Sequence, residues 1–513
     1  MTALDRESTV AVVGTGTMGQ GIAQVALLAG HRVLLHDTAP GRAQAAAEGI
    51  GGRLDRLVAK GRLEPRDHQA AMARLTPAES VMELAGCALV VEAVVEDLAA
   101  KQRLFSELEE VVTEDCLLAT NTSSLSVTAV AGALARPGRL VGLHFFNPAP
   151  VLPLVEVVAG AAGDAAAVAT AYDTVAAWGK TPVHCTDTPG FLVNRVARPF
   201  YAEALRVYEE RAADPATIDA LLRESGGFAM GPFALMDLIG QDVNEAVTRS
   251  VWEAFLHDPK FTPSLAQRRL VESGRLGRKS GRGWFSYDSQ NEGAPHRMGG
   301  AHGEAAGPRN AQPAAGPGRV VVRGSLGPAR ALAELAAESG IEVAVDPSAG
   351  DAAILLPSGT PMRLADGRLP DGPGIQFDLA LDYRAATRIG IAPSGPVHAA
   401  DVDQAVGFFQ ALGKEVSVIR DVPGMVVART VAMLVDLALD ALAGEIASAR
   451  DIDTAMRQGV NYPLGPLEWG ERISASYVRD LLEALHVWYP GGRYAPCPEL
   501  RRRAAAEGGV VSS

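Results

Sequence analysis

The chain has 513 residues, of which 48% are hydrophobic and 21% are charged, and its formal net charge is −13. This composition excludes a disordered chain and predicts a globular protein of two to four domains. The acidic balance argues against a nucleic-acid-binding protein, and no apolar stretch approaches the roughly 20 residues of a membrane span. Four cysteines without CxxC spacing predict neither a metal site nor a disulfide framework, so we expect a cytoplasmic protein without a signal peptide.

The N-terminal third has the pattern of a parallel α/β sheet. A β-branched run, a glycine-rich turn, a helix and a second short strand ending at Asp37 form a βαβ unit. Further apolar strands at 88–94, 116–120 and 139–146 alternate with helical stretches. This alternation predicts an α/β Rossmann-type domain with a mostly parallel, doubly wound sheet over residues 1–186.

The rest of the chain divides into four segments. Long amphipathic stretches predict an all-α domain over 187–288, and a Gly-, Ala- and Pro-rich segment predicts a flexible linker over 289–318. Residues 319–414 have the pattern of a degenerate second Rossmann-like segment, and residues 415–513 that of a second all-α domain.

Three motifs of the first helical domain recur 234 residues later, which indicates a duplication. The pairs are DTPGFLVNR (187–195) with DVPGMVVAR (421–429), TIDALL (217–222) with DIDTAM (451–456), and MGPFALMD (230–237) with LGPLEWGE (464–471). In the second Rossmann-like segment Arg323 stands next to Gly324, so we read the first fingerprint glycine as missing, although Asp346 ends the second strand. We therefore expect no nucleotide in the second copy.

A G-x-G-x-x-G motif follows the first strand and opens a helix, the context of a dinucleotide site. Gly14 makes the tight turn, Gly16 lets the backbone approach the pyrophosphate, and Gly19 allows close packing of helix and strand. Asp37 can accept the ribose hydroxyls and would repel a 2′-phosphate, so the predicted cofactor is NAD rather than NADP. The cofactor residues predicted here are Gly14, Gly16, Thr17, Met18, Gly19 and Asp37.

With NTSSLS at 121–126 and GLHFFNPAPVLPLVEVV at 142–158, the sequence resembles the L-3-hydroxyacyl-CoA dehydrogenases, including the 3-hydroxybutyryl-CoA dehydrogenases. The resemblance covers about 8–288 and resumes over about 415–490. The two-copy layout is similar to a long bacterial subgroup associated with phenylacetate degradation. The resemblance implies NAD-dependent, reversible oxidation of an L-3-hydroxyacyl-CoA to the 3-oxoacyl-CoA, as in fatty-acid metabolism.

Oxidation of a secondary alcohol needs a base, and a histidine suits that role. His144 lies in an apolar run, and Glu156 stands alone in the next one, where an unpartnered acid is costly to bury. The resemblance implies that His144 is the base and that Glu156 orients it. It also implies that the Ser123 hydroxyl binds the substrate oxygen and that Asn194 orders the site. A turn or cap role is the alternative for Ser123, although Ser124 is the better candidate for a helix cap.

The resemblance assigns further residues to the cofactor. It places Glu96 and Lys101 near the nicotinamide half, Asn147 at the carboxamide and Lys279 close to the cofactor. Solvent-exposed positions on a helix are the alternative for Glu96 and Lys101, and a solvated lysine is the alternative for Lys279.

Coenzyme A carries several phosphate charges, so an acidic protein must bind it with local cations. Arg53, Arg56 and Lys60 share one helix face at spacings i, i+3 and i+7 and are the candidates, with a solvated face as the alternative. The acyl group is left open between short and dicarboxylic groups, with 3-hydroxybutyryl-CoA and 3-hydroxyadipyl-CoA as candidates.

Two other functions are compatible with parts of the sequence. One is an NAD-dependent dehydrogenase of a β-hydroxy acid without CoA, and the other is a non-catalytic NAD(H)-binding protein. The second copy has Ala428 where the first has Asn194, so we expect that copy to be structural. We expect the helical domains to pair, either in a homodimer or as a pseudo-dimer within one chain.

Overall fold

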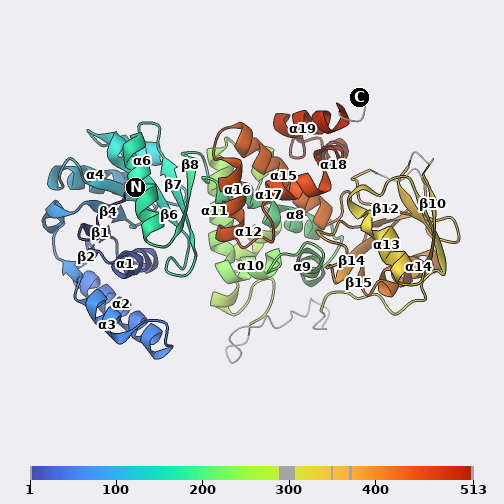
Figure 1. Ribbon diagram of the computed structural model, residues 1–513, viewed down its shortest axis with the longest axis horizontal. Coiled ribbons are helices and arrows are strands. Elements are labelled where there is room, and N and C mark those ends of the chain that lie inside the picture. Colours follow the sequence, from blue (N-terminus) through green and yellow to red (C-terminus); the bar gives the residue numbers. More distant parts are fainter. Residues whose placement is uncertain (1–2, 288–306, 348–350, 369–371, 510–513) are drawn as a thin grey trace. The chain divides into compact units, whose positions relative to one another are not determined.

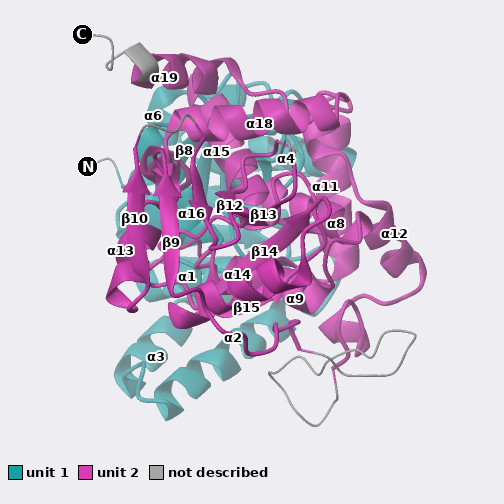
Figure 2. Cartoon of the chain, turned by 90° about the vertical axis from the view of Figure 1, so that its right-hand side faces the viewer, with its two compact units in different colours: residues 1–195, 444–460 teal, residues 196–443, 461–513 magenta. Residues whose placement is uncertain are grey.

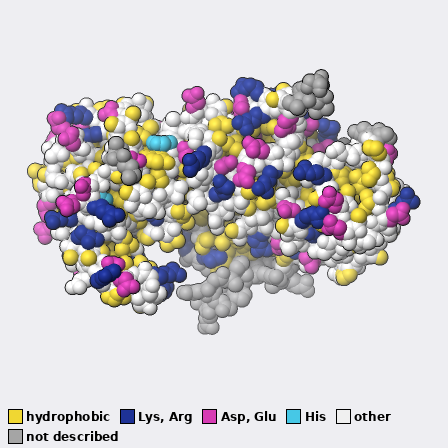
Figure 3. Space-filling view, in the orientation of Figure 1, with side chains coloured by type: hydrophobic (Ala, Val, Ile, Leu, Met, Phe, Trp, Pro, Cys, Tyr) yellow, Lys and Arg dark blue, Asp and Glu magenta, His cyan; other side chains and the backbone are white. Residues whose placement is uncertain are grey.

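The computed structural model describes residues 3–287, 307–347, 351–368 and 372–509 (Figure 1). It divides into two compact units, which Figure 2 shows in two colours. Unit 1 consists of residues 1–195 and 444–460, and unit 2 of residues 196–443 and 461–513. Within the described residues, none of the helices is long and apolar enough to span a membrane. On the face drawn in Figure 3, basic and acidic side chains are interspersed.

Unit 1 is built on an eight-stranded sheet of order β3-β2-β1-β4-β5-β6-β7-β8. Its strands are β1 (Thr9–Val13), β2 (Arg32–His36), β3 (Leu75–Ala78), β4 (Leu89–Glu92), β5 (Leu117–Thr120), β6 (Leu140–Phe145), β7 (Leu154–Ala159) and β8 (Thr181–Thr186). All neighbours are parallel except β6 and β7. The Val- and Leu-rich strands are buried because helices cover both faces, so the predicted doubly wound sheet is confirmed.

The helices of unit 1 include one from the far end of the chain. They are α1 (Thr17–Ala29), α2 (Arg42–Ala59), α3 (Pro65–Met72), α4 (Leu98–Val111), α5 (Val127–Ala131), α6 (Ala165–Ala177) and α16 (Ala449–Gly459), while α7 (Val193–Val196) joins the units in sequence. α16 belongs to the second helical copy, yet it packs against β7 and β8 of the first sheet. The Thr186 N–H also donates a hydrogen bond to the Ile446 carbonyl.

Unit 2 contains most of both helical copies, which pack against each other. The first contributes α8 (Arg198–Glu209), α9 (Pro215–Glu224), α10 (Pro232–Ile239), α11 (Gln241–Ala254) and α12 (Leu265–Glu272), and the second α15 (Val427–Ala443), α17 (Pro466–Ile473), α18 (Ala475–Trp488) and α19 (Pro498–Gly509). α8 packs on α15, where the buried Arg429 guanidinium binds Glu203 and Glu210. The duplicated domains therefore meet within one chain.

The second sheet, here the relic sheet, also lies in unit 2 and has the order β10-β9-β11-β12-β13-β14-β15. Its strands are β9 (Arg319–Arg323), β10 (Glu342–Asp346), β11 (Ala353–Leu355), β12 (Pro361–Leu364), β13 (Gly374–Phe377), β14 (Arg388–Ser394) and β15 (Glu415–Val418), and its helices are α13 (Ala331–Glu338) and α14 (Ala399–Ala411). The predicted degenerate Rossmann-like segment is thus confirmed, but it includes β15, which pairs with β14 beyond the expected limit at 414.

The expected linker, 289–318, is structured in its second part. Residues 289–306 lie outside the described residues, whereas 307–318 run along the relic sheet. The Ala311 N–H donates to the Val416 carbonyl, and the Ala314 N–H donates to Gln410 Oε1. The segment has no hydrophobic periodicity in the sequence, but backbone N–H groups hold it, and the small side chains of Ala311 and Ala314 pack against the core of the relic sheet.

The two sheets share their register. In unit 1 Leu143 pairs with Val157 across β6 and β7, next to the His144–Glu156 pair, and 234 residues later Phe377 pairs with Ile391 in the same register across β13 and β14. The first βαβ unit recurs with an offset of 310, since β9 begins at Arg319 where β1 begins at Thr9. The difference between the offsets reflects the loss of the elements from α2 to α5 in the second copy, where the β11–β12 ribbon stands instead.

Candidate active site

The glycine-rich turn after β1 has the backbone that a dinucleotide site requires. Gly14 has φ +94°, and a Cβ there would lie 2.5 Å from the Ala93 carbonyl oxygen. A Cβ at Gly19 would collide with the Gly14 carbonyl. At Gly16, by contrast, a Cβ would meet nothing within 4 Å, and no side chain caps the α1 N-terminus there. The first N–H groups of α1 are therefore open to an anion, which fits the pyrophosphate of NAD.

Asp37 lies beside this turn and is held by it. Its Oδ2 accepts hydrogen bonds from the Thr15 N–H (2.9 Å) and hydroxyl (2.7 Å), and its Oδ1 accepts from the Ala39 N–H (3.1 Å). Burial alone would raise the pKa of Asp37, but these hydrogen bonds lower it overall, so the carboxylate is ionised. Thr15 was not singled out in the sequence, although its place inside the fingerprint was a signal. Thr17 and Met18 form the first turn of α1.

His144 and Glu156 face each other across the antiparallel strands β6 and β7. His144 Nδ1 lies 2.6 Å from Glu156 Oε2, and the two residues are 5% and 0% exposed. The rings of Phe146 and Phe191 flank the imidazole at 4.6 and 5.7 Å between centroids. Because a carboxylate only accepts, Nδ1 donates the hydrogen bond and Nε2 keeps a lone pair that can take a proton.

The second carboxylate oxygen of Glu156 is also occupied. Oε1 accepts hydrogen bonds from the backbone N–H groups of Leu192 (3.1 Å) and Val193 (2.7 Å), where α7 begins. The acid therefore binds the histidine with one oxygen and the start of α7 with the other. Asn194 is the next residue of α7, so it directly follows the backbone that Glu156 holds.

Ser123 lies in a loop that is organised by Glu96. Glu96 Oε1 accepts hydrogen bonds from the Thr122 hydroxyl (2.6 Å) and from the N–H groups of Ser123 (2.9 Å) and Ser124 (3.0 Å). Burial would raise the pKa of Glu96, but the Thr122 hydrogen bond and the charge of Lys101 lower it overall. Glu96 is exposed, but it precedes α4 rather than lying on it, and its carboxylate is held by this loop.

The expected cap at Ser124 is wrong. The Ser126 hydroxyl accepts the Ala129 N–H and caps α5, whereas the Ser124 hydroxyl donates to Glu96. The cap lies two residues later because the Ser124 hydroxyl is already bound by Glu96, a partner distant in sequence. Asn121 Oδ1 accepts the Phe145 N–H (2.9 Å), which ties this loop to the end of β6 beside His144.

Lys101 is buried at 1% exposure rather than solvated. Its ammonium group lies 2.5 Å from Glu92 Oε1 and 3.3 Å from Glu96 Oε2. Glu92, at the end of β4, also accepts the Thr120 hydroxyl. Sequence reasoning missed Glu92, although a lone acid in an apolar run is the signal that identified Glu156. Asn147 follows β6 and is exposed at the same edge of the sheet.

The predicted cluster of CoA cations is only partly available. Arg53 points toward α1, where its Nε donates to Gln24 Oε1 (3.1 Å) and its Nη1 to Gln20 Oε1 (2.9 Å). Arg56 and Lys60 are exposed at the end of α2. Lys279 lies in unit 2, where its ammonium group pairs with Asp242 at 2.6 Å.

In the second copy, the turn after β9 has lost a different glycine of the fingerprint from the one that we expected. Gly324 corresponds to Gly14: it has φ +60°, and its N–H donates to Asp346 as that of Gly14 donates to His36. The first fingerprint glycine is therefore present, and our reading that it is missing is wrong. The second is lost instead, because the offset of 310 places Leu326, buried in the relic core, where the first copy has Gly16.

The second copy has also replaced the histidine–glutamate pair. The 234-residue offset places Asp378 at the position of His144 and Gly390 at that of Glu156. Asp378 accepts the N–H groups of Val426 and Val427, the counterparts of Leu192 and Val193. Burial raises its pKa to about 6. One acid thus keeps the structural hydrogen bonds of the lost pair.

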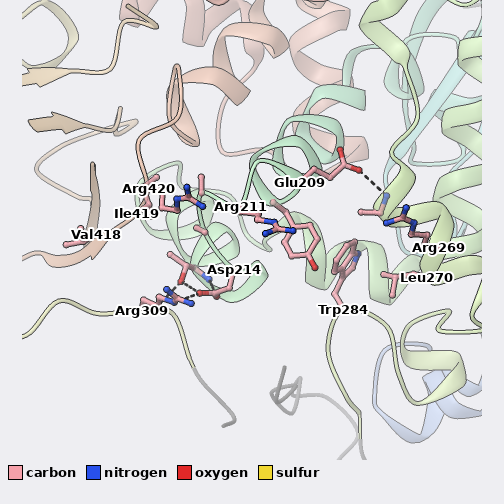
Figure 4. A pocket seen from close by; sticks show the side chains of 15 residues that line it. Glu209, Arg211, Asp214, Arg269, Leu270, Trp284, Arg309, Val418, Ile419 and Arg420 are labelled. Atoms are coloured by element: carbon pink, nitrogen blue, oxygen red, sulfur yellow. Dashed lines mark hydrogen bonds and ion pairs between the residues drawn. The ribbon is translucent and has the colours of Figure 1, made fainter. Parts of the chain in front are cut away.

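A hollow of about 810 Å³ lies in unit 2, apart from the predicted residues. Its lining includes four exposed arginines, namely Arg211, Arg269, Arg309 and Arg420. Figure 4 shows Arg309 and Asp214 pointing toward each other, at 3.0 Å. The lining contains none of the residues predicted for catalysis or cofactor binding, so the reaction is not placed there.

Comparisons with known proteins match nearly the whole chain. The NAD-binding domain of 3-hydroxyacyl-CoA dehydrogenase matches residues 9–188, its C-terminal domain matches 190–287 and 424–508, and the reduced Rossmann-fold domain of 3-hydroxybutyryl-CoA dehydrogenase matches 363–423. These matches establish NAD as the cofactor and confirm the duplicated helical domain.

Individual relatives agree. The chain is 43% identical to the 3-hydroxyadipyl-CoA dehydrogenase of Escherichia coli K12 over 98% of its length and 99% of that protein. The crystal structure of an E. coli K12 3-hydroxybutyryl-CoA dehydrogenase matches with a TM-score of 0.87 and 40% identity, over 99% of this chain and all of the other. A Mycobacterium tuberculosis H37Rv 3-hydroxybutyryl-CoA dehydrogenase is 40% identical over 55% of this chain and 99% of its own. The chain is a member of the 3-hydroxyacyl-CoA dehydrogenase family, an NAD-dependent oxidoreductase.

Proposed function

We propose that this enzyme oxidises the 3-hydroxyl group of a short or dicarboxylic L-3-hydroxyacyl-CoA, with His144 as the base and Glu156 as its orienting acid. The observation that carries the proposal is the buried 2.6 Å contact between the two side chains. Glu156 is buried and also binds the backbone of α7, so its carboxylate is held in one orientation. It therefore holds the His144 imidazole in one orientation too.

In oxidation, His144 Nε2 takes the hydroxyl proton of the substrate while the C–H hydride leaves. The chemistry that NAD would supply when bound is the acceptance of this hydride. The Glu156 carboxylate stabilises the imidazolium that forms, and in reduction His144 returns the proton to the carbonyl oxygen. The Ser123 hydroxyl binds the substrate oxygen, and Asn194, next to the backbone that Glu156 holds, orders the site.

Cofactor and CoA contacts complete the proposal. The open backbone at Gly16 and the α1 N-terminus bind the pyrophosphate, and Asp37 binds the adenosine ribose. Asn147 contacts the nicotinamide half of the cofactor, and Lys101 acts on the same half through its ion pair with Glu96. Lys279 is a further cofactor contact in this proposal. Of the three CoA candidates we favour Arg56 and Lys60, since Arg53 is held by α1.

The acyl group remains between two candidates. The relative named 3-hydroxyadipyl-CoA dehydrogenase shares the two-copy length of this chain, which favours a dicarboxylic acyl group. A solved structure that also matches nearly the whole chain is named a 3-hydroxybutyryl-CoA dehydrogenase, as is the relative that matches 55% of it. These names favour the 3-hydroxybutyryl group. A cytoplasmic location and a role in phenylacetate degradation remain predictions. The packing of α8 on α15 supports a pseudo-dimer of the two helical copies within one chain.

The first test is the consumption of NADH with acetoacetyl-CoA, with 3-oxoadipyl-CoA and with acetoacetate. We expect turnover with both CoA esters, a higher kcat/KM for one of them, and little turnover of the free acid. Efficient turnover of acetoacetate would instead support the dehydrogenase that needs no CoA. Absence of turnover with every substrate, despite NADH binding, would support the non-catalytic protein.

Replacing Gly16 with leucine should abolish NADH binding without unfolding the protein. The second copy carries Leu326 at this position, and a Cβ at Gly16 meets no protein atom, so the side chain would occupy the space of the pyrophosphate. NADH fluorescence titration measures the loss, and Leu326→Ala serves as the control because it should leave NADH affinity unchanged. Wild-type affinity in the Gly16→Leu variant would show that the cofactor binds elsewhere.

A further inference from the structure

The second helical copy covers the strand that carries Glu156. On α16, Ile452, Ala455 and Met456 are buried, and the helix packs against β7. A Cβ at Gly459 would lie 2.5 Å from Leu154 Cδ2, so the end of α16 touches the first residue of β7. Side chains two apart on a strand share a face, so Glu156 projects to the same face of β7 as Leu154.

The relic sheet shows which residue of α16 faces Glu156. Its α9 is the counterpart of α16, and it packs against β14, the counterpart of β7. There the Ser225 hydroxyl donates to the Arg388 carbonyl (2.6 Å), and these two residues correspond to Gly459 and Leu154. One helical turn earlier, a Cβ at Gly390 would lie 3.1 Å from Leu221 Cδ2.

Leu221 and Gly390 correspond to Ala455 and Glu156 through the same 234-residue offset. Four residues of a helix advance about 6 Å and two residues of a strand about 6.6 Å, so contacts one turn apart on the helix match positions two apart on the strand. The sizes are complementary: a large leucine faces the glycine of the relic sheet, and a small alanine faces the glutamate of the active one.

We propose that Ala455, supplied by the second copy, is a positioning residue for the Glu156–His144 pair. Its methyl group closes the face of β7 and leaves the room in which Glu156 reaches His144 Nδ1 and the backbone of Leu192 and Val193. A larger side chain would push the carboxylate from these partners, because a packed interior has no spare volume. The second copy is therefore retained although its own pair is lost. The catalytic consequence rests on the proposed role of His144.

The test is the Ala455→Leu variant, which places on α16 the leucine that α9 carries at the equivalent position, Leu221. We expect kcat to fall by about 10–100-fold, part of the roughly 10²–10⁴-fold that a general base contributes, while NADH affinity and KM stay within about twofold. Ala455→Ser, which is nearly as small, should keep the wild-type kcat. The matched control is Leu221→Ala, which opens a cavity at the equivalent place and should lower Tm without changing kcat.

A second readout is independent of turnover. The Nδ1 proton of a 2.6 Å N–H···O bond gives a downfield proton resonance in protein with ¹⁵N-labelled histidine, and His144→Ala identifies it. Ala455→Leu should shift or broaden this signal, and this result holds whether or not His144 is the base. A folded Ala455→Leu variant with an unchanged signal and wild-type kcat would overturn the proposal. Equal losses of kcat in Ala455→Leu and Leu221→Ala would also overturn it. Should Ala455→Leu not fold, Ala455→Val is judged by the same outcomes.

Discussion

Replacing His144 with alanine should lower kcat by about 10²–10⁴-fold, the contribution of a positioned general base. The loss follows from the geometry, since Glu156 holds His144 at 2.6 Å near the end of β6, where we propose that the substrate binds. NADH affinity should stay near that of the wild type, because Asp37 is held by Thr15 of the glycine-rich turn, whereas His144 is held by Glu156. Stopped-flow or steady-state consumption of NADH with acetoacetyl-CoA measures the change.

A control separates chemistry from packing. His144→Gln keeps a polar side chain of similar size, so Glu156 keeps a hydrogen-bond donor. We expect its kcat to fall like that of the alanine variant, while its Tm stays closer to that of the wild type. Near-wild-type kcat in either variant would assign the base to another group.

Replacing Glu203 with glutamine should lower the free energy of unfolding by about 3–5 kcal/mol, as for a broken buried ion pair. Glu203 is fully buried on α8 and binds the guanidinium groups of Arg429 (2.8 Å) and Arg493 (2.6 Å) and the Tyr494 hydroxyl (2.7 Å). The three partners belong to the second copy, so the variant leaves two buried cations short of a countercharge where the copies meet. Urea unfolding at pH 7 measures the effect.

The same carboxylate predicts a pH dependence. Burial alone would raise the pKa of Glu203, but Arg493 and Arg429 lower it to about 2, below the ordinary value of 4.5. The folded state therefore holds the proton less tightly than the unfolded chain. The stabilisation is complete above about pH 4.5, and it decreases as the pH falls toward 2, by about 3 kcal/mol in all.

In the Glu203→Gln variant this acid-dependent contribution should be absent. Glu114→Gln is the control, because Glu114 pairs with Arg136 on the surface, where an ion pair contributes little. Equal urea midpoints of wild type and Glu203→Gln from pH 7 to pH 3 would show that the buried network does not stabilise the paired copies.

The active half of the molecule was predictable because its signals are local. The β-branched run, the glycines and Asp37 lie within one βαβ unit, and His144 and Glu156 lie on adjacent strands joined by a short connection. Chain order therefore brings them together. Arg53 was predicted for CoA but is bound by Gln20 and Gln24 of α1, a partnership that helix periodicity on α2 does not show.

The second copy shows the limit of reading motifs alone. Gly324 was misread because the sequence alone does not show whether Gly324 or Gly327 corresponds to the first glycine of the fingerprint. The pairing of β9 with β10 identifies Gly324 as the counterpart of Gly14. The loss of the pair is likewise clear only when Asp378 and Gly390 are aligned with β6 and β7 through the sheet.

By itself the sequence determined the family, the cofactor class, the duplication and the histidine–glutamate pair, because each depends on residues close together in the chain or on a constant offset. Only the tertiary structure decided that α16 crosses to the first sheet, that Lys101 is buried between two acids, and that Glu203 binds residues nearly 300 positions away. These contacts join segments far apart in the chain. Their strength comes from burial and from excluded water, which the spacing of residues along a sequence does not contain.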